Sequence, residues 1–385
     1  MLRECQFEKL TSRQGNRLRI VFRVDASLEI GTGHVMRCLT LADVLCARGA
    51  TCLFVCRAHP GNLLNSIHQR GYETLSLPKI GEGAGVAQGT GGTQPRHAAW
   101  VGVDWTTDAR QTLALMKDKF ADWLIIDHYG LDWCWEGVLR PVSARIMVID
   151  DLADRRHDCD VLLDQGLGRS ALDYEGLVPS ACKIFAGADH VLFRPEFHTL
   201  REESYARRKI PRLRNLLVTM GGVDAFNATT AVLEVLGDFP LPPECRITVV
   251  MGLNSIWLEQ VRDRAENLPY ATQVLVDVQN MAEVMAANDF AITAAGITAL
   301  ECCFLGLPTL AVVLADNQRR GAKALHDAGV VEALDVGDSI GEGLHAKLPH
   351  LLRSEKLEKM QRACSDFMRE LDDRRGNTGL IDALL

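Results

Sequence analysis

Residues 18–34 have the sequence LRIVFRVDASLEIGTGH, which joins a short apolar run to a polar loop containing two glycines. In the stretch that follows, 34–48, the apolar side chains recur at the spacing of one helix face. A strand, a loop with small residues and a helix form the first unit of a doubly wound α/β sheet. We therefore expect a parallel sheet whose first loop lies at the carboxyl end of a strand.

The same alternation continues along the chain and starts again at residue 215. Near-continuous apolar runs ending in aspartate suit parallel strands that are covered on both faces. The expected strands are residues 18–24, 51–56, 123–127, 145–150, 215–220, 246–251, 272–276, 290–293 and 309–314, and the expected helices are 34–48, 62–70, 225–237, 255–267, 281–287, 298–305 and 317–328.

The restart predicts an α/β protein with two doubly wound, Rossmann-like domains facing a cleft. A length of 385 residues leaves room for about two domains. The expected divisions are an N-terminal extension at 1–16, an N-terminal domain at 17–208 and a C-terminal domain at 209–385. The C-terminal domain includes a helical tail that can pack back across both domains. A glycine-rich segment at 81–93 interrupts the pattern and predicts a surface loop.

The composition excludes several classes of protein. Hydrophobic residues make up 47% of the chain, which indicates a globular protein, and 42 basic against 50 acidic residues give a net charge of −8. A net acidic chain is a poor binder of nucleic-acid polymers. Residues 1–16 contain no apolar run typical of a signal peptide. The apolar stretch 290–315 is interrupted by Glu301 and by Gly306-Leu-Pro308, which favours strand–helix–strand over a membrane span. We therefore expect a cytoplasmic protein without a membrane partner.

The first candidate site is the loop that ends at His34. Gly31 and Gly33 allow close backbone approach, and the helix after them directs free N–H groups into the loop. His34 can act as a general base near neutral pH, and a capping or structural histidine is the alternative. Asp25, at the start of the loop, is a candidate to orient His34 or a bound sugar.

A second candidate group follows the strand predicted at 123–127. Asp127 precedes His128 and Tyr129, an unusual density of polar groups, although a turn with a satisfied aspartate is the alternative. Asp127 is therefore a second candidate to orient His34 or the sugar. An acidic run at 150–165 suggests a metal site, but no histidine stands at ligand spacing. We expect no metal and no other cofactor.

The second half of the chain offers groups that suit a nucleotide. Gly221-Gly222 joins a strand to a helix, so its backbone amides can approach a phosphate. Gly296, Ile297 and Thr298 begin another helix, and Glu301 lies one turn further on. A carboxylate can accept hydrogen bonds from two sugar hydroxyls. A capping-box role with Thr298 is the alternative for Glu301.

In their order and spacing, several motifs together resemble the UDP-sugar hydrolases of pseudaminic acid biosynthesis. The resemblance extends over roughly residues 18–330. The matching blocks are 22–42, Asp127-His-Tyr-Gly-Leu-Asp132, Asp150-Asp-Leu-Ala-Asp-Arg155, Asp160-Val-Leu-Leu-Asp-Gln165, Leu192-Phe-Arg-Pro-Glu-Phe197, Met220-Gly-Gly-Val-Asp224, 294–301 and Leu305-Gly-Leu-Pro308.

The resemblance implies a glycosyltransferase-B-like fold in which water replaces the sugar acceptor. The expected reaction is hydrolysis of a UDP-linked 2,4-diacetamido-2,4,6-trideoxy sugar to free sugar and UDP, with inversion at the anomeric carbon. The UDP would lie against the second domain. In the family, the histidine of the Gly-x-Gly-His loop is the proposed general base, which corresponds to His34. The other matching positions imply substrate contacts for Arg194 and Glu301, and for Asn317 and Gln318 near the sugar.

Three other functions remain open from the sequence. The same fold can carry a UDP-sugar glycosyltransferase, a non-catalytic nucleotide-sugar-binding protein or a UDP-sugar 2-epimerase. Ile297, Ala299 and Leu300 stand where relatives more often have Ser, Ser and Trp, which affects sugar selectivity. The expected partner is a small-molecule UDP-sugar, and the oligomeric state is unknown from sequence.

Overall fold

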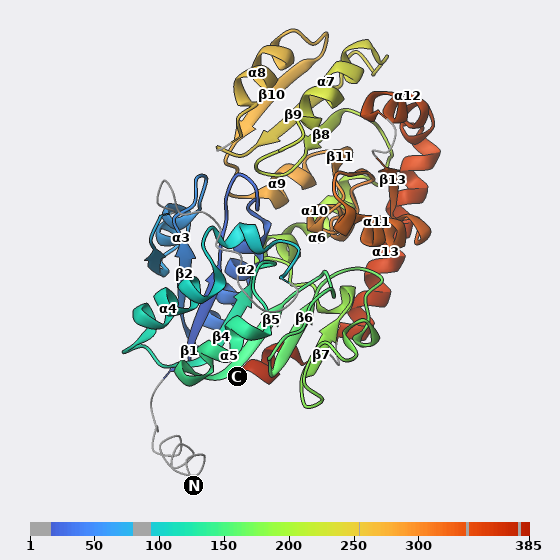
Figure 1. Ribbon diagram of the computed structural model, residues 1–385. Helices are drawn as coiled ribbons and strands as arrows, with labels where there is room; N and C mark the ends of the chain where they lie inside the picture. Colours follow the sequence, from blue (N-terminus) through green and yellow to red (C-terminus); the bar gives the residue numbers. More distant parts are fainter. Residues whose placement is uncertain (1–16, 80–93, 254, 336–338, 376–378) are drawn as a thin grey trace.

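A computed structural model describes residues 17–79, 94–253, 255–335, 339–375 and 379–385 (Figure 1). The N-terminal extension expected at 1–16 and the loop expected at 81–93 lie outside the described residues. The chain forms two doubly wound α/β domains, each built on its own parallel sheet. The predicted fold class is therefore confirmed.

The first domain contains a described sheet of seven parallel strands in the order β3-β2-β1-β4-β5-β6-β7. The winding reverses between β1 and β4, which lie side by side. The loops beyond the carboxyl ends of these two strands are the expected place for a ligand. The strands are β1 (Arg19–Val24), β2 (Thr51–Arg57), β3 (Glu73–Leu77), β4 (Ala121–Asp127), β5 (Ser143–Ile149), β6 (Val161–Asp164) and β7 (Lys183–Ala186), and the helices are α2 (Gly33–Ala47), α3 (Leu64–Gln69), α4 (Trp105–Met116), α5 (Trp133–Leu139) and α6 (Pro195–Arg207).

The second domain repeats this arrangement with a described sheet of six parallel strands, in the order β10-β9-β8-β11-β12-β13. Here the winding reverses between β8 and β11. The strands are β8 (Asn215–Thr219), β9 (Arg246–Met251), β10 (Ala271–Val276), β11 (Phe290–Ala294), β12 (Thr309–Val313) and β13 (Val331–Asp335), and the helices are α7 (Ala228–Asp238), α8 (Leu258–Glu266), α9 (Met281–Ala286), α10 (Ile297–Phe304), α11 (Asp316–Asp327), α12 (Ile340–Leu351), α13 (Ser354–Arg375) and α14 (Leu380–Leu384).

Each sheet is buried on both faces. Successive strand residues point to opposite sides of the sheet, and those on each side join a separate core. In β1, Phe22 packs with α2 on one face, while Val21 joins the core beneath α4 and α5 on the other. In β8, Leu216 and Leu217 divide in the same way between two cores. This double burial explains why the strands appear in the sequence as apolar runs rather than as alternating patterns.

The C-terminal tail packs against both domains, as the sequence suggested. Helix α12 packs on α7, and α13 contacts both α10 and the short turn Ala188–His190. Figure 1 shows α13 running beside the two sheets. Finally α14 covers the first sheet, where the Trp123 indole donates a hydrogen bond to the Leu384 carbonyl at 2.9 Å. The tail therefore ties the two sheets together.

The apolar stretch 290–315 forms β11, α10 and β12, which confirms the predicted strand–helix–strand. No helix in the described ranges is long and apolar enough to cross a membrane. The sequence predictions missed β3, β6, β7 and β13. Three of these are edge strands, which carry fewer apolar residues because they are less completely covered.

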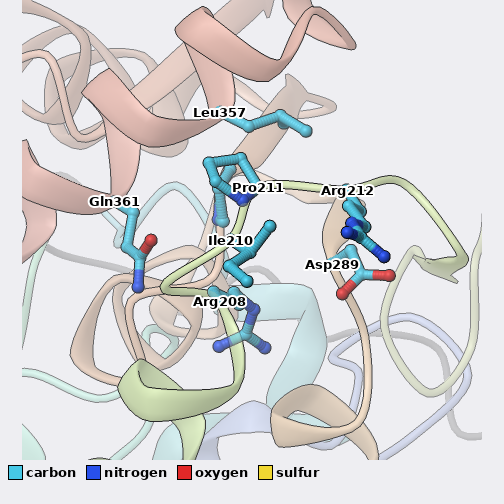
Figure 2. A pocket seen from close by; sticks show the side chains of 8 residues that line it. Arg208, Ile210, Pro211, Arg212, Asp289, Leu357 and Gln361 are labelled. Atoms are coloured by element: carbon cyan, nitrogen blue, oxygen red, sulfur yellow. The ribbon is translucent and has the colours of Figure 1, made fainter.

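The segment between α6 and β8, residues 208–214, is the linker between the two domains, and its buried Arg208 joins it to the second domain. The Arg208 guanidinium donates to the backbone carbonyls of Met285, Asn288 and Leu305 at 2.7, 2.5 and 3.0 Å. These carbonyls lie at or just beyond the ends of α9 and α10, and helix C-termini carry partial negative charge. Burial, with Arg207 nearby, lowers the pKa of Arg208 to about 10, so it remains a cation at neutral pH. Figure 2 shows Arg208 beneath the linker residue Ile210.

We predict that Arg208→Met lowers the free energy of unfolding by about 3 kcal/mol, because several buried carbonyls lose their donor together. Denaturant unfolding of the purified protein measures this change. Arg262→Met is the matched control, since Arg262 is exposed and pairs with Glu259 on the same helix. Its effect should stay within about 0.5 kcal/mol. An equal loss in the two variants would contradict the role assigned to Arg208.

Candidate active site

The loop between β1 and α2 is a compact turn that brings His34 to the edge of the sheet. Ser27 closes the turn: its hydroxyl accepts the N–H groups of Glu29 and Ile30, and its carbonyl accepts the Gly31 N–H. Gly31 adopts φ +80°, which glycine reaches without strain. Gly33 then begins α2, so His34 lies in its first turn.

His34 is held by the buried carboxylate of Asp127, at the end of the neighbouring strand β4. The His34 Nδ1 and Asp127 Oδ1 atoms lie 2.6 Å apart. An ionised carboxylate only accepts hydrogen bonds, so Nδ1 carries the hydrogen and the neutral ring keeps a lone pair on Nε2. Nε2 has no hydrogen-bond partner among the described residues. The arrangement presents a basic nitrogen at the carboxyl edge of the sheet.

Arg37 holds the other side of the same carboxylate. It donates from Nε to Asp127 Oδ2 at 2.5 Å and from Nη2 to Asp127 Oδ1 at 2.7 Å. Burial alone would raise the pKa of Asp127, but Arg37 and His34 outweigh it and hold that pKa well below its usual range. Asp127 therefore remains an anion that can orient His34.

Asp151 and Tyr129 extend this network. Arg37 Nη1 donates to Asp151 Oδ2 at 2.9 Å, and the Tyr129 hydroxyl donates to the other Asp151 oxygen. The Tyr129 ring packs edge-on against His34, with centroids 4.5 Å apart. Arg37, Tyr129 and Asp151 were not singled out as site residues from the sequence. Their signals were present, since Arg37 is one helical turn after His34 and Asp151 follows the strand next to β4.

Asp25 has a different position from the one we expected. Its carboxylate is fully buried and pairs with Arg23 at 2.7 Å, while the backbone N–H of Arg57 donates to it at 2.6 Å. The Nε2 atoms of His59 and His128 approach its other oxygen, at 3.5 and 3.4 Å. No described hydrogen bond joins Asp25 to His34. The structure therefore does not pair Asp25 with His34, and its carboxylate instead joins β1 to β2 through Arg23 and the Arg57 backbone. A contact between Asp25 and the sugar stays a prediction.

The second-domain candidates follow three adjacent strands. Gly221 and Gly222 come after β8, Gly296 precedes α10 after β11, and Asn317 begins α11 after β12. Because β8, β11 and β12 are neighbours in one parallel sheet, these loops share its carboxyl edge. The sheet thus places on one edge the second-domain groups that were predicted separately.

Free backbone amides are available at this edge. The N–H groups of Gly221 and Gly222 have no hydrogen-bond partner among the described residues, and the same holds for Ile297 and Thr298 in the first turn of α10. By contrast, the start of α7 is already occupied, because the Asp224 carboxylate accepts two of its N–H groups. Among these helix starts and loops, the free N–H donors therefore lie in the glycine pair and in α10.

The two sets of candidates meet where the domains touch. A Cβ atom built on Gly222 would lie 2.9 Å from the Thr32 hydroxyl, and one on Gly252 would lie 2.1 Å from the Gly222 carbonyl oxygen. Gly222 is therefore packed between the His34 loop and the loop after β9. This close approach requires glycine and brings the free amides next to the loop that carries His34.

Glu301 and Arg194 also come together across the chain. Arg194, which precedes α6, places Nη2 3.5 Å from Glu301 Oε1. The Glu301 side chain is 16% exposed, and burial raises its pKa to about 7 despite Arg194. No described side chain caps the first turn of α10, so the capping-box alternative for Glu301 with Thr298 is wrong.

Asn317 and Gln318 differ in their availability. Asn317 is exposed at the start of α11. The Gln318 side-chain oxygen accepts the backbone N–H of Leu314 at 2.8 Å, which leaves its amide nitrogen as the group for a ligand. Within the described ranges, no group of three or more His, Cys, Asp or Glu side chains is arranged to hold a metal ion.

Comparison with known proteins agrees with the fold described above. Residues 215–374 match the glycosyltransferase family 28 C-terminal domain. The chain is 26% identical over 313 residues to the UDP-2,4-diacetamido-2,4,6-trideoxy-beta-L-altropyranose hydrolase of Campylobacter jejuni, covering 81% of this chain and 97% of that protein. This confirms the resemblance found in the sequence.

A second relative is named as a transferase. The chain is 29% identical over 202 residues to the UDP-N-acetylglucosamine--N-acetylmuramyl-(pentapeptide) pyrophosphoryl-undecaprenol N-acetylglucosamine transferase of Carboxydothermus hydrogenoformans, covering 50% of this chain and 54% of that enzyme. Among solved structures, LpCGTa in complex with UDP superposes with a TM-score of 0.60 at 13% identity, covering 96% of this chain and 97% of that one. The fold is of the glycosyltransferase-B type.

We predict that Glu301→Gln stabilises the ligand-free protein at pH 8 and has little effect at pH 5. The folded state keeps the Glu301 proton up to a pKa of about 7, whereas the unfolded chain releases it near 4.5. Wild-type stability from this group is therefore lost as the pH rises through that window. The difference is on the order of 1–3 kcal/mol.

Thermal unfolding between pH 5 and pH 8 measures this effect. Glu259→Gln is the control, because Glu259 is 85% exposed. A stability difference for Glu301→Gln that does not change with pH would show that Glu301 does not titrate as described.

Proposed function

We propose that this protein hydrolyses a UDP-linked 2,4-diacetamido-2,4,6-trideoxy sugar to the free sugar and UDP, with inversion at the anomeric carbon, as a step of pseudaminic acid biosynthesis. The observation that carries the proposal is the His34–Asp127 pair, which leaves His34 Nε2 free. The loop just before His34 touches Gly222 of the glycine pair through Thr32. The similarity to the C. jejuni hydrolase supports the same reaction. The comparisons also support the coarser assignment, an enzyme that processes nucleotide sugars.

The second domain would hold the UDP group. The backbone amides of Gly221 and Gly222, with the first turn of α10, supply N–H donors for the diphosphate. Glu301 would accept hydrogen bonds from sugar hydroxyls of the nucleotide, and Arg194 would keep that carboxylate in place. Departure of UDP needs little protonation by a side-chain acid, because UDP is already a good leaving group. The proposal uses no metal or other cofactor.

The first domain would supply the base. A water molecule on the face opposite UDP attacks the anomeric carbon, and its proton passes to His34 Nε2. The bond from that carbon to the β-phosphate oxygen breaks, and its electron pair leaves with UDP. Asp127 stabilises the imidazolium that forms, as a buried carboxylate does for a catalytic histidine. Attack from the opposite face inverts the anomeric configuration.

A glycosyltransferase is the second candidate, since both the domain family match and the C. hydrogenoformans relative carry that name. It would use the same His34 and nucleotide contacts to activate an acceptor hydroxyl. A non-catalytic sugar-nucleotide-binding protein would retain the second-domain contacts without turnover. An epimerase would return a UDP-sugar rather than a free sugar. With UDP-sugar alone, the hydrolase releases free sugar and UDP and the epimerase returns a different UDP-sugar, whereas the transferase and the binding protein form no product without an acceptor.

The experiment is incubation of the purified protein with UDP-2,4-diacetamido-2,4,6-trideoxy-β-L-altropyranose and no acceptor, followed by NMR of the products. We expect free UDP and a sugar whose first-formed anomer is inverted. His34→Ala should lower kcat by about 10²–10⁴-fold while UDP affinity stays within about twofold. His68→Ala, an exposed histidine on α3, is the control. Near wild-type turnover by His34→Ala would refute the role of this base, and no UDP release by wild type would refute hydrolysis.

Asp127→Asn should lower kcat on the order of 10²–10⁴-fold with little change in KM, because an amide does not hold the Nδ1–H form or stabilise the imidazolium. Arg37→Met should cause a smaller loss, with partial recovery in Arg37→Lys, since the main role of Arg37 is to hold the Asp127 and Asp151 carboxylates. Steady-state kinetics across pH 6–9 measure both effects. Loss confined to KM would contradict this assignment.

A further inference from the structure

Residues 94–101, which we name the cover segment, pack directly over the polar loop after β4. A Cβ atom built on Gly130 would lie 2.7 Å from the His97 carbonyl oxygen and 2.8 Å from a methyl group of Val101. Real side chains do not approach this closely, so the cover segment is seated on Gly130. Its position relative to Asp127 and His34 is thereby set by the backbone of the site itself.

The cover segment adds an aromatic wall beside His34. The Trp100 and Tyr129 rings stack, with centroids 5.7 Å apart and planes at 25°. Both rings stand at 82° to the imidazole of His34, at 4.5 Å for Tyr129 and 6.4 Å for Trp100. His97 packs on the far side of this pair, 4.4 Å from Trp100. Together these groups leave the His34 side chain only 9% exposed.

Trp100 is the more accessible of the two stacked rings. The Nδ1 edge of His34 is taken by Asp127 and Arg37, so approach to the ring is restricted to its Nε2 side. Tyr129 is 5% exposed and fixed through its hydroxyl, whereas Trp100 is only partly buried. Of the two stacked rings, Trp100 is therefore the one that an incoming molecule would meet.

The cover segment also reaches the second domain. Arg96 Nη2 lies 3.6 Å from Asp316 Oδ2, at the start of α11 next to Asn317. Both side chains are largely exposed, so this ion pair contributes little stability. The ion pair shows where the cover segment lies: its Trp100 is 6.4 Å from the His34 ring, and its Arg96 reaches the start of α11, which is expected near the sugar.

We infer that Trp100 is a specificity-determining residue that restricts the nucleophile at His34 to water. This inference rests on the proposed hydrolysis and deepens it, because it assigns to one side chain the choice between water and a larger acceptor. With water, an oxygen–carbon bond forms at the anomeric carbon, the bond to UDP breaks and the proton goes to His34. With an alcohol the same bonds change, and the product is an alkyl glycoside instead of the free sugar.

The physical basis is the volume behind the attacking oxygen. Water carries only hydrogens there, whereas an alcohol must place at least one carbon on the side away from the sugar. The Trp100 ring stacks on Tyr129 and also contacts His97, so it cannot yield that space without losing contacts. Discrimination by one carbon against a rigid apolar wall is typically tenfold or more, within a range of about 10–200-fold.

The test is product partitioning in graded alcohols. Wild-type protein, Trp100→Ala and Trp100→Phe are incubated with the same UDP-sugar in 1 M methanol, ethanol or 1-propanol, and free sugar and alkyl glycoside are quantified by mass spectrometry. We expect wild type to form almost only free sugar. Trp100→Ala should raise the ratio of methyl and ethyl glycoside to free sugar by about tenfold or more. Trp100→Phe, which keeps a ring, should stay near the wild-type ratio.

Two further variants keep the result interpretable. Trp133→Ala is the matched control, because Trp133 is 47% exposed and its ring contacts the Arg156 guanidinium, outside the site. Gly130→Ala displaces the cover segment without changing a ring, and it should shift partitioning in the same direction as Trp100→Ala. Because partitioning is a ratio of products, it is independent of how much protein is folded.

The outcomes separate this inference from the proposed function. If wild type releases free sugar and Trp100→Ala partitions as wild type does, the hydrolase stands and the inference about Trp100 is overturned. The same conclusion follows if wild type itself forms alkyl glycosides readily. If no variant releases UDP, the proposed hydrolysis has failed, and with it the inference that rests on it.

Discussion

The carboxylate of Asp127 is the interaction on which the site depends. It ends the central strand β4, it is fully buried, and each of its oxygens is bound by α2, through His34 and Arg37. A buried anion without such donors would be costly, so the first turn of α2 is held against the end of the sheet. That contact in turn sets the tautomer of His34 and directs its second nitrogen outward. Removal of Arg37 would therefore weaken the hold on Asp127 and, through it, on His34.

Two features of the second domain matter for the site: the close backbone contact at Gly222 and the partly buried carboxylate of Glu301. Gly222 lets the domains approach at the His34 loop because any side chain there would meet Thr32. Glu301 is kept in a partly buried position where ionisation is unfavourable, which a sugar hydroxyl donor would relieve. Arg208 is buried without a carboxylate partner in the described ranges and is satisfied by helix ends instead.

The glycosyltransferase-B fold by itself does not distinguish transfer from hydrolysis. Both reactions need a nucleotide held by backbone amides and a base facing the anomeric carbon. The difference must come from the surroundings of that base. In this chain those surroundings are Tyr129 and the cover segment with Trp100, and the latter comes from a part of the sequence that has no recognisable motif. This is why the family resemblance points to the class of substrate more firmly than to the acceptor.

The sequence by itself determined the two parallel sheets, the strand–helix–strand at 290–315, the loop of the glycine pair and the helix starts that carry His34 and Glu301. These features follow from local patterns: apolar runs, helix periodicity and small residues at strand ends. Only the tertiary structure decided that Asp127, not Asp25, binds His34, that Arg37 and Asp151 complete the network, and that Gly222 meets Thr32. Strand order brings β1 beside β4 across about a hundred residues, and such long-range pairing leaves no local trace in the sequence.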